Sequence, residues 1–199
     1  MALSDIRSEI PRTFFHIVGG ISLACAAWFP DPPTNQIVLG LIFAASVAGE
    51  IGRLTFPGLN RLTLAVAGSV MRPGEKKGLS GLPAFTGGVF AAFLLFPKPV
   101  ALAAMVPLLF GDRAGLLVGK GVGRIRMWGK TLEGSLACLV VSFLVYILLA
   151  WSWPGVFGYP RGVLFAAALV GTMAEAMPRP FDDNITIPIA VGIFLTLVT

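Results

Sequence analysis

Long apolar blocks separated by short polar segments dominate the chain. Strict alternation of apolar and polar residues is absent, so the blocks predict helices rather than half-buried strands. Several are shorter than the roughly 20 residues of a complete membrane span. The seven blocks cover residues 13–29, 36–52, 82–96, 100–118, 134–151, 162–177 and 185–198. A shorter apolar stretch, residues 61–71, is expected to lie in the membrane interface or to begin a re-entrant segment.

The composition indicates lipid as the solvent of these helices. Hydrophobic residues make up 56% of the 199 residues and charged residues only 13%, about half the usual charged fraction of a soluble domain. Backbone groups inside a bilayer must be satisfied internally, which restricts the chain to helices or a closed barrel. We therefore predict an all-α, polytopic membrane helix bundle with about seven transmembrane helices, forming a single domain over residues 1–199.

The basic residues fall on alternate connections between the blocks. Only Lys98 and Arg161 lie in the connections on the opposite side. The positive-inside rule then places the N-terminus and the two long basic loops in the cytosol. The basic residues of the predicted cytosolic side are Arg7, Arg12, Arg53, Arg61, Arg72, Lys76, Lys77, Arg113, Lys120, Arg124, Arg126, Lys130 and Arg179.

Most of the acidic residues follow the same sidedness. Glu50 and Glu175 fall in the last turns of apolar blocks, and Asp112 falls inside one. Charges at such positions are costly and usually face a bundle interior or a wet cavity, which makes them functional candidates. The alternative for any single acid is an ion pair that fixes helix packing. Seven acids near cytosolic ends favour a site: Glu50, Glu75, Asp112, Glu133, Glu175, Asp182 and Asp183.

Residues 110–135 combine the groups that a metal–polyphosphate requires. Asp112 precedes a glycine-rich stretch, expected to be a flexible turn, around which lie Lys120, Arg124, Arg126 and Lys130. Carboxylates hold Mg²⁺, cations neutralise phosphates, and the start of the following helix favours an anion. The stretch matches neither the GxxxxGK[ST] phosphate loop nor a dinucleotide fingerprint. A flexible basic loop without a ligand is the alternative.

Two further segments carry candidate polar groups. Asp182 and Asp183 are adjacent and precede Asn184 at the start of the last block. One of them is explained by capping the helix, whereas a repelling pair suggests a cation between them, with Mg²⁺ the natural candidate. At the start of the first block, Arg12 and His16 are four residues apart and share a helix face.

In its order of motifs, the chain resembles the CTP-dependent lipid-alcohol kinases, which include dolichol kinase, phytol kinase and yeast-type diacylglycerol kinase and are related to the phosphatidate cytidylyltransferases. The resemblance extends from Arg12 to Pro188. One departure is Thr13, where family members commonly have lysine. Four blocks carry the resemblance: Arg12, His16 and Gly20; Arg72, Glu75, Gly78 and Gly81; Gly111, Asp112, Ala114, Gly119, Gly123, Gly129, Lys130, Thr131, Glu133, Gly134 and Ser135; and Glu175, Asp182, Asp183, Asn184, Ile187 and Pro188.

The resemblance implies transfer of the γ-phosphate of CTP to the hydroxyl of a membrane lipid alcohol at the cytosolic face, with Mg²⁺ as cofactor. Asp112, with Asp182 or Asp183, is expected to hold Mg²⁺. The candidates for the catalytic base are Asp112, Glu133 and Glu175. The residues expected to bind the nucleotide are Arg12, His16, Arg72, Gly119, Lys120, Gly123, Arg124, Lys130, Thr131 and Asn184.

Alternatives remain open at this point. A cytidylyltransferase would attack CTP at the α-phosphate and release pyrophosphate. A small transporter would place acids near the midplane in repeat-related spans, and no internal repeat is apparent. The lipid is not specified: polyprenol or dolichol, a phytol-like alcohol and diacylglycerol all need only an apolar groove. The expected partners are the bilayer, the lipid and the nucleotide, without nucleic acid, and a homodimer is compatible with the sequence.

Overall fold

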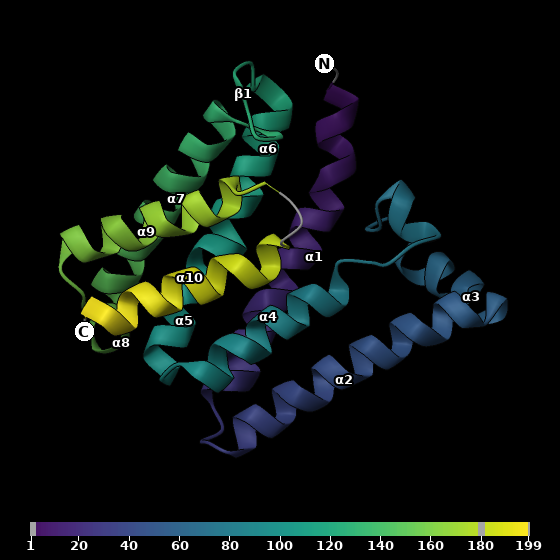
Figure 1. Ribbon diagram of the computed structural model, residues 1–199, viewed down its shortest axis with the longest axis horizontal. Helices are drawn as coiled ribbons and strands as arrows, with labels where there is room; N and C mark the ends of the chain where they lie inside the picture. Colours follow the sequence, from purple (N-terminus) through teal and green to yellow (C-terminus); the bar gives the residue numbers. More distant parts are fainter. Residues whose placement is uncertain (1–2, 179–181, 199) are drawn as a thin grey trace.

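The computed structural model describes residues 3–178 and 182–198, and it is helical apart from one short hairpin (Figure 1). Arg179, one of the predicted cytosolic cations, and the side chain of Arg7 lie outside the described part. In chain order the elements are α1 (Leu3–Trp28), α2 (Thr34–Thr55), α3 (Pro57–Ala67), the 3-10 helix η1 (Pro73–Lys76), α4 (Leu82–Leu95), α5 (Lys98–Val106), the π-helical turn η2 (Pro107–Gly111), α6 (Asp112–Val122), β1 (Arg126–Met127), β2 (Lys130–Thr131), α7 (Leu132–Ser152), α8 (Pro154–Phe157), α9 (Arg161–Ala176) and α10 (Asp183–Val198).

Each predicted apolar block corresponds to helix, with α5, η2 and α6 together forming the fourth. Four helical segments are long and apolar enough to cross a membrane, namely residues 9–28, 34–55, 98–122 and 132–152. Helices α4 and α10 are apolar but shorter. The prediction of a membrane helix bundle is thus confirmed in its helical character, while the number of seven spans stays a prediction. The short stretch expected in the interface, residues 61–71, overlaps the second half of α3, a helix that has no buried residue among those described.

The continuous segment from α5 to α6 is the centre of the bundle. Most of its residues are buried, whereas each of the other three long apolar segments buries less than a third of its residues. The helix widens to a π turn immediately after Pro107, and Asp112 is the first residue beyond that turn. Such single π turns inside helices often occur at functional sites.

Helices α6 and α7 approach closely through glycines, which corrects the prediction of a flexible turn at Gly119 and Gly121. Both residues belong to α6, and only Gly123 lies beyond its end. A Cβ atom built on Gly119 would meet Oγ1 of Thr131 at 2.8 Å, and one on Gly134 would meet the carbonyl oxygen of Gly115 at 2.7 Å. The glycines therefore allow two backbones to touch, a role that small residues have in membrane bundles.

We expect Gly134→Ala to destabilise the protein by about 1–3 kcal/mol, because the new methyl group has no room against the α6 backbone. Gly19→Ala is the matched control, since its Cβ would meet no atom within 4 Å; it should be neutral or slightly stabilising. Thermal unfolding in detergent, followed by size-exclusion chromatography, measures both. Equal melting temperatures for the two variants would contradict the close contact.

The polar connections gather at one end of the bundle. In Figure 1 the N-terminal end of α1, the β1–β2 hairpin and the loops that lead into α4 and α10 lie away from the C-terminus. The hairpin pairs Arg126 with Thr131 and Met127 with Lys130. It was not predicted, because two-residue strands leave no periodic pattern in the sequence. Its effect is to return the chain so that Lys130 enters the polar end.

Candidate active site

A cavity of about 920 Å³ occupies this polar end, between α1, η1, the start of α4, α6, the hairpin and the start of α10. Four cations and four carboxylates line it, so its walls carry both positive and negative charges. They are Arg12, Arg72, Arg113 and Lys130, together with Glu75, Asp112, Asp182 and Asp183. Seven of the residues predicted for the site therefore converge here: Arg12, Arg72, Asp112, Lys130, Asp182, Asp183 and Asn184.

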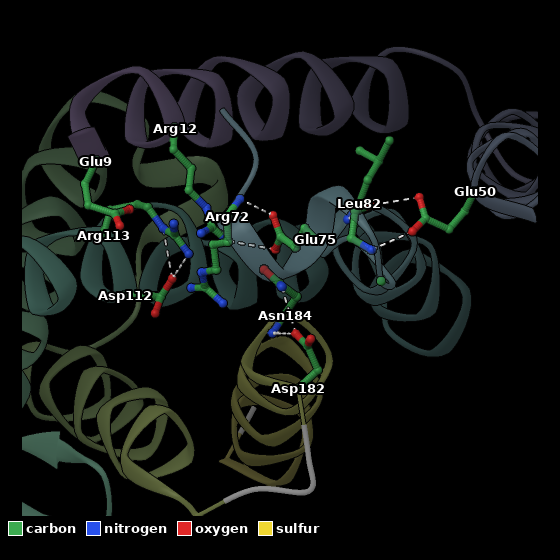
Figure 2. A network of polar contacts seen from close by, with 12 residues as sticks. Glu9, Arg12, Glu50, Arg72, Glu75, Leu82, Asp112, Arg113, Asp182 and Asn184 are labelled. Atoms are coloured by element: carbon green, nitrogen blue, oxygen red, sulfur yellow. Dashed lines mark hydrogen bonds and ion pairs between the residues drawn. The ribbon is translucent and has the colours of Figure 1, made fainter. Parts of the chain in front are cut away.

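One wall is built by η1 and α1. The carboxylate of Glu75 accepts a hydrogen bond from the backbone N–H of Arg72 at 2.7 Å, which closes the 3-10 turn. Its other oxygen pairs with Nη2 of Arg12 at 3.4 Å. Glu75 thus fixes the backbone at Arg72 and holds the guanidinium group of Arg12, and Figure 2 shows both arginines beside it.

The most buried ion pair that lines this cavity is Asp112 with Arg113, at 4% and 6% exposure. Arg113 donates to Oδ2 of Asp112 through Nε, at 2.9 Å, and through Nη2. In Figure 2 the other carboxylate oxygen of Asp112 points away from Arg113. A buried charge that is half engaged and lines a cavity is available to a ligand.

Lys130, in β2, connects the hairpin to two helices. Its Nζ lies 2.6 Å from Oε1 of Glu175 in α9 and 2.8 Å from Oδ2 of Asp183 in α10. Burial by itself lowers the pKa of Lys130, but the charges of Glu175, Asp112 and Asp183 outweigh it and raise the pKa above its usual value. Lys130 therefore stays cationic at neutral pH, inside a cavity that carboxylates surround.

The two acids at the start of α10 have different roles: one caps the helix and the other pairs with a cation. Oδ1 of Asp182 accepts from the backbone N–H of Asn184 at 2.9 Å and from its side-chain amide at 2.7 Å. Asp182 is thus the residue that caps the helix, and Asp183 is the partner of Lys130. The second acid is explained by an ion pair, and both acids still line the cavity.

Among the described residues, no three His, Cys, Asp or Glu side chains lie together in a way that could hold a metal ion. The described residues therefore do not support a metal ion held by protein groups alone. Mg²⁺ that binds with a nucleotide takes only one or two carboxylates and completes its shell with phosphate oxygens and water. Asp112, Asp182 and Asp183 line one cavity together with four cations. This donor set fits a magnesium–nucleotide better than a permanent metal centre.

Comparisons with known proteins give this cavity a context. No family model and no solved structure matches the chain. The curated CTP-dependent diacylglycerol kinase 1 of Eremothecium gossypii is 29% identical over 95% of this chain and 67% of its own length. The protein of the same name from Schizosaccharomyces pombe is 27% identical over 96% and 94%. Dolichol kinase of Saccharomyces cerevisiae is 33% identical over 56% of this chain and 22% of its own length.

The chain is related to the CTP-dependent lipid kinases. This relationship confirms the resemblance that the four motif blocks indicate. It also fits the placement of those blocks, because Arg12, Arg72, Asp112 and Asn184 come from all four and line one cavity.

Several other residues that were predicted for the site lie near the cavity but do not line it. Lys120 pairs with Glu9 at 2.6 Å and joins α6 to α1. Oε1 of Glu133 accepts from the backbone N–H groups of Arg124 and Ile125, at 3.0 and 3.3 Å. Thr131 caps α7 by accepting from the N–H of Gly134. None of these lines the cavity, and neither do Gly119, Gly123 or Glu175.

His16 faces a different space. Its Nε2 lies 3.2 Å from the carbonyl oxygen of Leu108, and its ring packs on Phe85 with centroids 4.3 Å apart. It lines a neighbouring apolar groove instead of the polar cavity. Arg12, four residues earlier, lines both, so the shared helix face predicted for the pair is confirmed.

Among the cavity residues that were not predicted for the site from the sequence, Arg113 and Trp128 matter most for its chemistry. Arg113 was counted only as a loop cation, although its position next to Asp112 inside an apolar block was the available signal. Trp128 lines the cavity from the tip of the hairpin, where it has a positive φ of 46°. Its placement depends on a turn that the sequence pattern did not indicate.

A buried ion pair holds the loop that closes the cavity. Arg53 pairs with both carboxylate oxygens of Glu50 and donates to the carbonyl oxygen of Gly78 at 2.7 Å. Glu50 also accepts from the N–H and the hydroxyl group of Ser80, at 2.5 and 2.9 Å. The cluster ties loop 78–81 to α2. The reading of Glu50 as a packing ion pair is thus supported.

We expect Glu50→Gln to loosen loop 78–81, because it leaves Arg53 buried without its counter-charge, at a cost of about 3–5 kcal/mol. Hydrogen exchange of the peptide containing residues 78–81 should accelerate, while exchange in α7 stays unchanged. The double variant Glu50→Gln/Arg53→Met removes both charges and should recover part of the stability. Unchanged exchange in the single variant would contradict the clamp.

Proposed function

We propose that this protein transfers the γ-phosphoryl group of CTP to the hydroxyl of a membrane lipid alcohol. The observation that carries the proposal is the cavity in which Arg12, Arg72, Arg113 and Lys130 surround Asp112 at the polar end of an apolar helix bundle. The choice of CTP comes from the printed names of the relatives. We take residues 1–199 as one kinase-like domain with seven spans, the N-terminus and cavity facing the cytosol.

The reaction is an in-line displacement. The lipid oxygen forms a bond to the γ-phosphorus, the bond from that phosphorus to the β,γ-bridging oxygen breaks, and its electron pair leaves with CDP. The hydroxyl proton passes to a carboxylate or to water. Asp112 is the candidate base that lines the cavity, whereas Glu175 lies behind Lys130 and Glu133 lies in the first turn of α7. The products are a lipid phosphate, CDP and a proton.

Positioning and charge stabilisation supply most of the rate of such a transfer. Arg12, Arg72 and Lys130 hold the polyphosphate, and Arg113 orients Asp112 while presenting a second guanidinium nitrogen to the cavity. Asp112, with Asp182 or Asp183, would hold Mg²⁺. When bound with the nucleotide, Mg²⁺ neutralises charge that develops on the phosphate oxygens.

The test uses purified protein in detergent with Mg²⁺, γ-labelled CTP and either diacylglycerol or a polyprenol, with ATP in a parallel reaction. Label that moves from CTP into the lipid phase supports the proposal, and the labelled lipid identifies the acceptor. The second candidate is a cytidylyltransferase, which the same cavity accommodates. It predicts no transfer of label to lipid, and release of pyrophosphate when phosphatidic acid is supplied.

A further inference from the structure

A second cavity, of about 360 Å³, adjoins the first between α1, α2, α3 and the start of α4. Its walls are mainly apolar, with Phe15, Ala45, Leu59, Val70 and Phe85 among the lining residues. We call it the α2–α3 groove. Its outer wall, α3, has no buried residue and exposes Leu59, Leu62 and Val66, so this side of the groove presents an apolar surface.

The groove and the polar cavity share part of their walls. The two share the lining residues Arg12, Glu75, Ser80, Gly81, Arg113 and Asn184. These residues form a junction at which an apolar space meets a space that cations and carboxylates line. A ligand that bridges the junction needs an apolar body on one side and a reacting polar group on the other.

The junction contains polar atoms that have no partner within the protein. In the described part of the chain, six buried side-chain atoms lack a hydrogen bond, and three of them belong to junction residues: Nη1 of Arg12, Nη1 of Arg113 and Oδ1 of Asn184. Native proteins leave few such atoms unexplained, so each calls for a ligand or water. Two are cationic donors and one is an acceptor, a combination that matches a phosphate oxygen next to a hydroxyl group.

Deeper in the groove, the principal polar side chains are already engaged. His16 contacts the carbonyl oxygen of Leu108, Ser46 bonds to Thr86 at 2.8 Å, and Glu50 is held by Arg53 and Ser80. Burying a polar ligand against satisfied groups would leave that ligand's own groups without partners. The body of the groove is therefore suited to hydrocarbon.

We propose that the α2–α3 groove holds the hydrocarbon chain of the acceptor lipid, and that its hydroxyl lies at the junction and donates to Oδ1 of Asn184. Nη1 of Arg12 and Nη1 of Arg113 then contact the phosphoryl group that is transferred. Figure 2 shows these three side chains coming from α1, α6 and α10 toward one space. The inference rests on the proposed kinase function and adds the acceptor site to it.

The geometry restricts the acceptor to alcohols with a small head. The hydroxyl must reach the junction while the chain stays in the groove, and loop 78–81 closes over both cavities through Ser80 and Gly81. A polyprenol and a diacylglycerol both meet this condition. A lipid with a sugar or a phosphodiester next to the hydroxyl would bring polar groups against the engaged side chains and is not expected to be an acceptor.

The experiment narrows the groove without straining the backbone. Gly49 lines the groove, and a Cβ built on it meets no atom within 4 Å. We expect Gly49→Phe to lower kcat/KM for a long-chain diacylglycerol at least about tenfold, the effect of moderate overpacking in a binding site. The KM for CTP should not change, and the decrease in kcat/KM should be smaller for a short-chain diacylglycerol.

The matched control is Gly19→Phe, since Gly19 also has free space around its Cβ and lines neither cavity. It should behave as wild type with every acceptor. Wild-type kinetics for Gly49→Phe with the long-chain acceptor would overturn the proposal. If the wild-type protein transfers no label from CTP to any lipid alcohol, the proposed function fails instead.

A measurement that needs no turnover tests the site independently. Diacylglycerol with a diazirine in its chain should crosslink to peptides of α2 and α3, and unlabelled diacylglycerol should compete. The contrary result would be label confined to the separate apolar cavity lined by Trp28, Leu102 and Phe157, between α1, α5 and the end of α7. That outcome would move the acceptor to the other side of α1.

Discussion

Asp112→Asn is expected to reduce CTP-dependent transfer of phosphate to lipid by about 10³-fold or more, since we assign this one carboxylate both to Mg²⁺ binding and to the candidate bases. Asparagine keeps the size of the side chain and one acceptor for Arg113, so the fold should survive. Alanine is the poorer choice, because it leaves the guanidinium of Arg113, at 6% exposure, without a counter-charge.

The measurement is the rate of label transfer from γ-labelled CTP at saturating acceptor, together with size-exclusion chromatography and thermal unfolding in detergent. Asp31→Asn provides the control. Asp31 lies in the connection between α1 and α2 and pairs with Lys98 at 2.9 Å, its side chain 93% exposed. The control should retain full activity. Turnover within tenfold of wild type in folded Asp112→Asn would remove Asp112 from the mechanism.

Lys130→Met is expected to reduce both stability and activity, for separable reasons. It leaves Glu175, which is 3% exposed, and Asp183 without their shared cation. Breaking a buried ion pair from one side costs about 3–5 kcal/mol. The variant also removes a positive charge from the cavity that we assign to the polyphosphate, so the KM for CTP should rise.

A second variant separates the two effects. Lys130→Met/Glu175→Gln removes the buried carboxylate together with its partner, and it should recover much of the lost thermal stability. The KM for CTP should stay high, because the cation is still missing. If the double variant recovers activity along with stability, Lys130 supports packing only and has no part in binding the nucleotide.

Several features of this protein were predictable from the order of its residues. The apolar blocks predicted the helices, because a segment in lipid must satisfy its backbone N–H and C=O groups within itself, whatever its tertiary contacts. Charge sidedness placed the candidate residues at one end, and Asp112 within an apolar block was conspicuous because a charge there is costly. Four motif blocks then indicated the lipid-kinase relationship that the comparisons support.

The division of labour among the predicted residues required the structure. Lys120 and Lys130 look alike in the sequence, yet one pairs with Glu9 and the other enters the cavity. The difference arises because the β1–β2 hairpin, whose strands have two residues each, reverses the chain between these two lysines. Asp182 and Asp183 are likewise adjacent, but the first caps α10 while the second meets Lys130, since consecutive residues at a helix start point in different directions.

The sequence by itself determined that the chain suits a lipid bilayer, which segments are helical, and at which end of the bundle the charges gather. These features follow from composition and local order. Only the tertiary structure decided that Arg113 joins Asp112 in the cavity and that His16 faces an apolar groove. It alone showed that Arg12, Arg113 and Asn184, each with one unpartnered buried atom, line both cavities. Arg12 and Asn184 lie 172 positions apart in the chain, and their common place at the cavities depends on how α1, α6 and α10 pack, which no local pattern encodes.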